Sequence, residues 1–296
     1  MTTSESRGPI DFQPSPELYP FESRWFESSV GPVHYVDEGE GPPILMLHGN
    51  PTWSFLYRDI IRDLRSDFRC VAPDLPGFGL SARPDSYGYT PREHADVVRE
   101  LVQHLDLQNA IVMGQDWGGP VAMSVAASMP ERVRGLVMGN TWYWPNDQLV
   151  GKVFSLVLSS PPFQWLIKRR NFFVKRMMPT VMRRKLTAAE WAHYSEVQPP
   201  GMREGAAVFP REIRKSESWL TEVEANVKSQ LLEKPLLLTW GMKDMAFRPK
   251  AFLPRWQRDF PQATLVELHE AKHYIQEDAP EEIAAAIRNS YGSTDG

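Results

Sequence analysis

The stretch AIVMGQDWGG, residues 110–119, decides how the first half of the chain is interpreted. Its first four residues are apolar and predict a short buried strand, and the small residues after Gly118 predict a helix that runs to Ala127. Glycines on both sides of Asp116 allow a sharp strand-to-helix turn that exposes the central side chain. The stretch therefore predicts a turn that presents a nucleophilic carboxylate, although an aspartate that only caps the helix would give the same letters.

Strands and helices alternate on both sides of this turn. Short apolar or alternating runs predict strands at 25–27, 33–37, 44–47, 69–72 and 135–138, and stripes at helical spacing predict helices at 53–64 and 92–105. This alternation predicts a mostly parallel central sheet that is flanked by helices on both faces, and so an α/β fold.

The alternation stops after Asn140. Residues 141–225 contain helical pieces rich in aromatic residues and methionine, with prolines between them, and no predicted strand. Strands at 235–241 and 264–268 and helices at 250–260 and 281–291 then complete the alternating pattern. We therefore expect an α/β core formed by residues 1–140 and 226–296, with an inserted helical cap at 141–225.

The composition is that of a globular protein without a strong charge bias. Lys and Arg number 33 against 37 Asp and Glu, a net charge of -4 that argues against a nucleic-acid binder. The predicted cap alone carries a net charge of +5, so the remainder carries -9. The single cysteine, Cys70, excludes an intramolecular disulfide and favours a reducing, cytoplasmic location. No apolar run has the length of a membrane span.

Three further strand ends carry polar residues suited to nucleophilic hydrolysis. The loop at 48–51, HGNP, follows a predicted strand at the place where an α/β-hydrolase supplies one oxyanion N–H group. Asp244 and His273 each follow a later predicted strand. The chain order Asp116, Asp244, His273 is then the order of nucleophile, acid and base expected of this fold. Asp259 and Glu267 are alternative acids, because they also lie close by in the sequence.

With these motifs, the chain resembles the haloalkane dehalogenases of the α/β-hydrolase superfamily from about Phe12 to Tyr291. The resemblance is carried by the tracts YPFESRWF at 19–26, HGNPTW at 48–53, DLPGFG at 74–79, QDWGG at 115–119 and HYIQED at 273–278. It implies an α/β-hydrolase fold with an inserted helical cap.

The resemblance also implies a role for each candidate residue. Asp116 attacks the halogen-bearing carbon and becomes a covalent alkyl ester. The side chains of Asn50 and Trp117 hold the departing halide, and their backbone N–H groups stabilise the oxyanion of the second step. His273 is the base that activates water, and Asp244 orients it.

The position of the acid residue of the triad differs between branches of the family. One branch of the family places a glutamate at the end of the strand after the elbow helix, where this sequence has Asn140 and no carboxylate. An Asp-His-Asp triad with an Asn-Trp halide pair most resembles the third dehalogenase subfamily. The implied reaction converts a small halogenated hydrocarbon and water to an alcohol, a halide and a proton, in a detoxifying role. It needs no cofactor, metal ion or nucleic acid, and it leaves open whether the chain forms a homo-oligomer.

A soluble epoxide hydrolase is the nearest alternative, because it shares the elbow aspartate and the histidine. Such enzymes use two cap tyrosines as donors to the epoxide oxygen, and the predicted cap contains two, Tyr143 and Tyr194. They usually carry an aromatic residue in place of Asn50 and a histidine in place of Gln115, which favours the dehalogenase.

Three other hypotheses are weaker. The letters HEAKH at 269–273 match a zinc signature, but that signature requires a helix and a predicted strand runs into His269. A non-enzymatic binding member of the fold typically loses a triad residue, and this chain keeps every candidate. The basic residues at 168–170, 175–176 and 183–185 are interpreted as a solvated helix face, with contact to an acidic partner or an anionic surface as the alternative.

Overall fold

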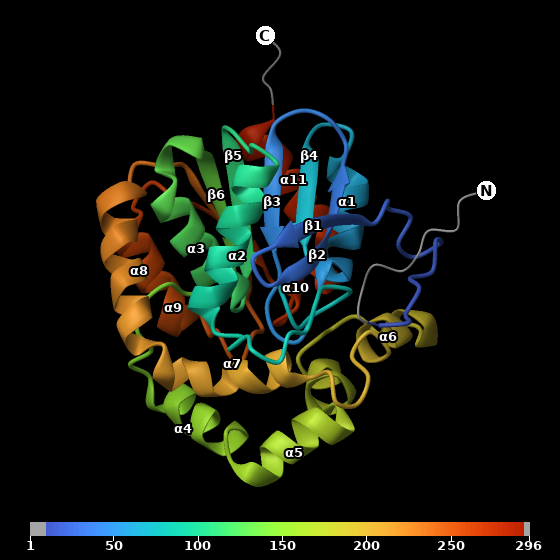
Figure 1. Ribbon diagram of the computed structural model, residues 1–296. Helices are drawn as coiled ribbons and strands as arrows, with labels where there is room; N and C mark the ends of the chain where they lie inside the picture. The colour runs from blue at the N-terminus through green and yellow to red at the C-terminus, as the bar shows by residue number, and fades with distance from the viewer. Residues whose placement is uncertain (1–9, 293–296) are drawn as a thin grey trace, which may run out of the picture.

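An eight-stranded sheet runs through the centre of the computed structural model, which describes residues 10–292 (Figure 1). The strand order is β1-β2-β4-β3-β5-β6-β7-β8. The pairs β1–β2 and β2–β4 are antiparallel and the others are parallel, so the prediction of a mostly parallel sheet is confirmed. The strands are β1 (Arg24–Ser28), β2 (Gly31–Glu38), β3 (Pro43–Leu47), β4 (Arg69–Pro73), β5 (Ala110–Gln115), β6 (Val133–Gly139), β7 (Leu236–Gly241) and β8 (Thr264–Leu268).

Helices cover both faces of this sheet, as the alternating pattern predicts. One apolar cluster joins the sheet to α2, α3, α8 and α9, and a second joins its other face to α1, α10 and α11. Every residue of β5 and β7 is buried, which explains their continuous apolar sequence. The helices are α1 (Arg58–Leu64), α2 (Pro91–His104), α3 (Gly118–Ser128), α8 (Glu217–Gln230), α9 (Pro249–Asp259), α10 (Ile275–Asp278) and α11 (Pro280–Tyr291).

The helix predicted at 53–64 is divided in the structure. Ser54–Tyr57 form a 3₁₀ turn, and α1 begins only at Arg58. The backbone N–H of Ser54 donates to the buried carboxylate of Asp74 at 2.8 Å, and all four residues of the turn are buried. Tertiary contacts therefore hold the tighter turn, which the apolar spacing alone does not reveal.

Between β6 and β7 the described chain forms helices and no strand. The α-helices are α4 (Leu149–Leu158), α5 (Pro161–Arg170), α6 (Ala188–Ser195), α7 (Glu204–Lys215) and α8, and a π-helical segment (Phe173–Met177) and a 3₁₀ turn (Met178–Thr180) lie between α5 and α6. Figure 1 shows α4, α5 and α7 lying across the lower end of the sheet. The predicted cap boundary at residue 225 falls inside α8, which packs against α3 of the sheet layer. The division into core and cap stays a prediction.

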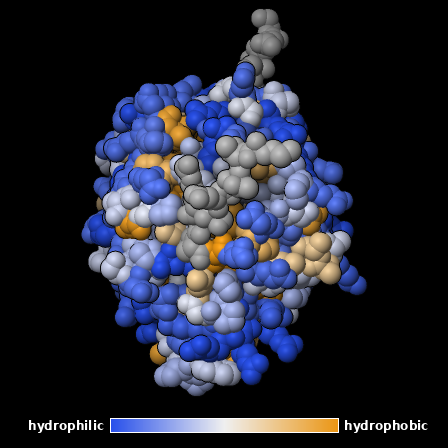
Figure 2. All heavy atoms as spheres, turned by 45° about the vertical axis from the view of Figure 1, so that its right-hand side comes forward, coloured by the Kyte–Doolittle hydropathy of each residue, from blue (hydrophilic) through white to orange (hydrophobic). Residues whose placement is uncertain are grey.

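The surface differs between regions: helix α4 exposes the large apolar side chains of Leu149, Val150, Val153, Phe154, Leu156 and Val157. The face in Figure 2 is mostly hydrophilic, and its hydrophobic patches are small and separate. Among residues 10–292, no helix combines the length and the apolar character needed to cross a membrane.

Candidate active site

Asp116 lies at the turn between β5 and α3 with a φ of +52°, a backbone conformation that is rare for a residue with a side chain. The turn is tight because α3 passes close to the end of β3. A Cβ atom on Gly118 would lie 2.0 Å from the carbonyl oxygen of Leu47, so only glycine fits there. The hydroxyl of Thr141 donates to the carbonyl oxygen of Asp116 at 2.6 Å and helps to hold this conformation.

Two backbone N–H groups lie beside the Asp116 carboxylate. The N–H of Asn50 donates to Oδ1 at 2.8 Å, and the N–H of Trp117 also bonds the carboxylate. Gly49 allows this approach, since a Cβ there would lie 2.4 Å from Oδ1. Burial raises the pKa of Asp116 above its usual value, although His273 and the two N–H groups oppose the shift.

His273 lies between the carboxylates of Asp116 and Asp244. Its Nδ1–H donates to Oδ2 of Asp244 at 2.9 Å, while Nε2 lies 3.7 Å from Oδ2 of Asp116. A carboxylate can only accept a hydrogen bond, so the proton of the neutral imidazole lies on Nδ1. Nε2 is then the nitrogen that can take a proton. Burial acts to lower the pKa of His273, but the charge and hydrogen bond of Asp244 outweigh it and raise the pKa above its usual value.

Asp244 is buried at the end of β7 and is held from three sides. Besides His273, it accepts bonds from the N–H of Ala246 at 2.6 Å and from Nδ2 of Asn140 at 2.6 Å. Burial acts to raise the pKa of Asp244, yet the charge of His273 and these hydrogen bonds bring it below its usual value. Asp244 is therefore a fixed anion beside the imidazole.

The alternative acids lie elsewhere. The carboxylate of Asp259 accepts the hydroxyl of Tyr143 at 2.7 Å, and Glu267 lies 3.8 Å from the exposed ring of His269. The structure thus brings Asp244, and neither of these two, to His273. Residues 269–273 form a turn instead of the helix a zinc signature requires, and residues 10–292 contain no group of three metal-ligating side chains.

A cavity of about 380 Å³ lies above Asp116. Its walls are mainly apolar, and its polar groups include the side chains of Asn50 and Trp117, which line the cavity together with Asp116. Nδ2 of Asn50 donates to the carbonyl oxygen of Ala206 at 3.4 Å. Val150 and Met245, 64% and 77% exposed, also line the cavity and mark its opening between α4 and the loop after β7.

Several neighbours of the triad were missed by sequence reasoning. Asn140 binds Asp244, Gln115 donates from Nε2 to the carbonyl oxygen of His273 at 3.0 Å, and Phe247 stacks on the His273 ring at 5.5 Å between centroids. Trp142 lines the cavity with an indole N–H that is buried and has no partner among the described residues. Only Asn140 had a signal, since it follows a predicted strand of the parallel sheet.

Comparisons with known proteins agree with this geometry. Residues 42–280 match the model of the alpha/beta hydrolase fold family. Haloalkane dehalogenase 2 of Mycobacterium tuberculosis is 57% identical over 96% of this chain and 99% of its own length. A cis-3-alkyl-4-alkyloxetan-2-one decarboxylase of Xanthomonas campestris is 30% identical over 86% and 91%. The crystal structure of haloalkane dehalogenase DbeA from Bradyrhizobium elkani superposes with a TM-score of 0.83 at 27% identity, over 91% and 97%. The chain belongs to the haloalkane dehalogenases of the α/β-hydrolase fold family.

Proposed function

We propose that this chain hydrolyses haloalkanes in two steps, with Asp116 as the nucleophile. In the first step, Oδ2 of Asp116 attacks the halogen-bearing carbon of a substrate that lies in the apolar cavity. A carbon–oxygen bond forms as the carbon–halogen bond breaks, and the halide leaves with the bonding electrons. The observation that carries this step is the position of the carboxylate, which is ionised without help from a base and faces the cavity.

The side chains of Asn50 and Trp117 are proposed to hold the departing halide. Negative charge develops on the halogen, so the site needs hydrogen-bond donors beside the leaving group. An indole N–H only donates, and an amide donates through its NH₂ group. Neither group carries a full positive charge, which would delay release of the halide.

The second step hydrolyses the ester on Asp116. Nε2 of His273 takes a proton from water as the water oxygen attacks the ester carbon. The oxyanion forms on Oδ1, to which the N–H of Asn50 already donates, and the N–H of Trp117 lies beside the same carboxylate. Asp244 holds His273 in the required tautomer and stabilises its charged form. The alkoxide leaves with the proton from His273, and the regenerated carboxylic acid then ionises and releases one proton.

Esterification itself prepares His273 for this step. The charge of Asp116 is one of the influences that raise the pKa of His273. The ester is neutral, so that influence disappears when the intermediate forms. His273 is then more readily unprotonated at the moment when a base is needed.

The epoxide hydrolase alternative lacks its donors in this structure. The hydroxyl of Tyr143 donates to Asp259, and that of Tyr194 donates to Glu277. Neither tyrosine lines the cavity above Asp116. The identity of 57% to a dehalogenase, against 30% to an oxetanone decarboxylase, favours the dehalogenase over that second alternative as well.

The test is halide release from 1-bromobutane or 1,2-dibromoethane, with an epoxide and a cis-3,4-dialkyl-oxetan-2-one run beside them. We expect bromide and alcohol from the wild-type chain, and neither diol nor alkene. The variant His273→Ala should release one equivalent of bromide and then stop, with one alkyl group on Asp116 by mass spectrometry. Asp116→Asn is the control and should give no burst. Normal turnover by His273→Ala would contradict the mechanism.

Two further predictions belong to this proposal. Residues 141–225 form the cap over the cavity, and residues 1–140 and 226–296 form the core that holds the triad. The lone cysteine, Cys70, is buried and free, which agrees with a cytoplasmic location.

A further inference from the structure

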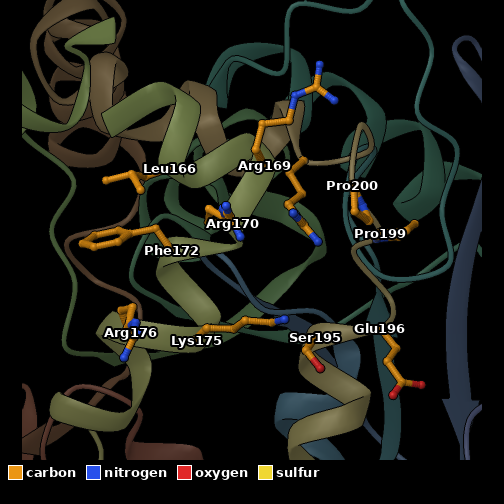
Figure 3. Close-up of a pocket in the computed structure, with 11 residues that line it drawn as sticks. Leu166, Arg169, Arg170, Phe172, Lys175, Arg176, Ser195, Glu196, Pro199 and Pro200 are labelled. Carbon is orange, nitrogen blue, oxygen red and sulfur yellow. The ribbon is translucent and has the colours of Figure 1, made fainter. Parts of the chain in front are cut away.

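A second and larger hollow lies on the helical region, away from the triad (Figure 3). We call it the basic groove and define it by the side chains of Arg169, Arg170, Lys175, Arg176 and Arg203. Its volume is about 1150 Å³, and none of its lining residues lines the cavity above Asp116. One wall is the end of α5 with the turn that follows, and the other is the segment from Ser195 to Arg203.

Four of the five cations are exposed and have no acidic partner in the described chain. Arg169, Arg170, Lys175 and Arg176 form no ion pair, whereas their neighbour Lys168 pairs with Glu204 at 2.5 Å. Figure 3 shows Lys175 extending across the groove toward Ser195. Glu196 is the only carboxylate that lines the groove, and its oxygens point away from Lys175. The groove therefore holds a local excess of positive charge.

Arg203 is the least expected member of this set, because it is only 5% exposed. Its Nε donates to the carbonyl oxygen of Gln198 at 2.6 Å and its Nη1 to that of Lys168 at 2.9 Å. No carboxylate lies within ion-pair distance of it in the described chain. Burial lowers the pKa of Arg203, which reflects the cost of burying a guanidinium that no anion neutralises.

The dipole of α5 accounts for only part of this charge. Cations near the C-terminus of a helix are favourable, and Arg169 and Arg170 lie in the last turn of α5. Lys175 and Arg176 follow the left-handed residue Asn171, and Arg203 precedes α7, so none of these three belongs to that turn. Lys175 and Arg176 lie in the last turn of the next helical segment, Phe173–Met177, so helix ends account for all four exposed cations. They do not account for the buried Arg203, which lines the same groove.

We propose that the basic groove binds a phosphoryl group, either free in solution or as the headgroup of a lipid. Guanidinium groups match the oxygens of a phosphate through paired N–H donors, and Lys175, which extends toward Ser195 from the wall that carries Arg170, adds a point charge. A bound phosphoryl group would supply the anion that Arg203 lacks. This proposal does not depend on the reaction at Asp116.

The first arm of the test uses free phosphate. Inorganic phosphate is titrated into the wild-type chain, with binding followed by ³¹P NMR line broadening at an ionic strength held constant with sodium chloride. The test variant is Arg170→Gln with Lys175→Gln, which leaves the partly structural Arg203 in place. The matched control, Lys215→Gln with Lys250→Gln, removes the same charge from two exposed lysines that do not line the groove.

The second arm uses vesicles. Co-sedimentation is measured with phosphatidylcholine vesicles and with vesicles in which part of the phosphatidylcholine is replaced by phosphatidic acid. Binding in either arm should weaken by about tenfold or more in the test variant and stay unchanged in the control variant, since charge-assisted hydrogen bonds are lost only in the former.

The two arms distinguish the sources of the ligand. Binding of inorganic phosphate alone assigns the groove to a soluble phosphate compound, and binding to phosphatidic acid vesicles alone assigns it to a lipid headgroup. The proposal is overturned when neither probe binds the wild-type chain, or when the test and control variants lose binding equally. The bromide release assay, run on both variants, checks that each is folded.

Discussion

The molecule contains two largely buried clusters of charged side chains, and the two clusters differ in composition. The Glu277 cluster contains Arg58, Arg184, Glu190 and Glu277 and joins α1, α6 and α10. Asp59 and Arg62 extend the cluster, because Asp59 pairs with Arg58 at 3.3 Å, with Arg184 at 3.7 Å and with Arg62 at 3.1 Å, so that three arginines meet three carboxylates. Glu277 receives Arg58 at 2.5 and 2.8 Å and Arg184 at 2.6 Å. The triad instead places two carboxylates around one imidazole, beside an open cavity.

The difference lies in what remains unpartnered. Around the triad, Oδ1 of Asn50, Oε1 of Gln115 and Nε1 of Trp142 are buried without a hydrogen-bond partner in the described chain. No side-chain atom of the Glu277 cluster is in that state. A balanced cluster stabilises one packing of the helices. Of the unpartnered groups at the triad, the indole N–H of Trp142 can donate to a halide or to water, and the two amide oxygens can accept from water. We expect substitutions in the first cluster to change stability and those in the second to change rate.

The largest expected effect is that of Asp244→Asn. An amide cannot stabilise the charged form of His273 and favours the wrong tautomer, so steady-state bromide release should fall by about 10³- to 10⁴-fold. The burst of one equivalent should remain, because the first step does not use His273. The control Asp259→Asn changes the carboxylate that binds Tyr143 and should leave turnover unchanged. An equal loss in both variants would contradict the assignment of Asp244.

Glu277→Gln should have its main effect on stability. It removes one of the carboxylates that Arg58 and Arg184 share and leaves them Glu190 and Asp59. Breaking a buried pair completely costs about 3–5 kcal/mol, so the loss here should be below that range, at about 2 kcal/mol. Urea unfolding measures this loss, and turnover of the folded protein at low temperature should be nearly normal. The exposed Glu267→Gln is the control and should stay within about 0.5 kcal/mol of the wild type. If Glu277→Gln were as stable as the wild type, the proposal that the Glu277 cluster acts on stability and the triad on rate would be contradicted.

Most of the fold could be predicted from the sequence because its signals are local. The buried strands β3, β5 and β7 are short apolar runs bounded by glycine or proline, and the small residues after Gly118 predict α3. The single-turn helix α10 and the division before α1 could not be predicted in this way. Both depend on burial against other elements instead of on a repeating pattern.

The proximity of the three candidate residues was predictable from chain order, and their catalytic roles stay a prediction. Asp116, Asp244 and His273 each follow a strand, and parallel strands bring their carboxyl ends to one edge of the sheet. The neighbours of the triad had little or no such signal. Gln115 and Phe247 reach His273 through side-chain directions that no spacing encodes, and the pairing of Arg58 with Glu277 joins residues far apart in the chain.

Asn140→Ala tests a positioning role at the triad, with a smaller effect. Asn140 donates to Asp244 and accepts the N–H of Gly241 at 2.7 Å, so its loss should lower kcat by about tenfold with little change in KM. The matched control is Asn171→Ala, because Asn171 is also buried and has a φ of +51°. Both variants should lose some stability, since alanine tolerates that backbone conformation poorly. Only Asn140→Ala should have a lower kcat. An equal decrease of kcat in Asn171→Ala would show that Asn140 acts only through the stability of the fold.

The smallest expected effect is a displacement of the pH profile. His273 acts in the second step only when it is neutral, so kcat should fall as the pH drops through its pKa. In the free protein that pKa is raised, partly by the charge of Asp116, and the ester removes this charge. The acid limb of kcat should therefore lie at lower pH than the titration of His273 in the free protein, measured by NMR of its ring.

The raised pKa of His273 also stabilises the folded state below the ordinary histidine pKa of about 6.5. This contribution to stability is lost as the pH rises through the pKa of His273 in the folded protein. As pH rises, the increase in kcat should therefore come before the loss of this contribution to stability, because the loss follows the titration of His273 in the free protein. If the acid limb of kcat coincided with the NMR titration, the charge of Asp116 would have no effect on the pKa of His273. That result would contradict the prediction.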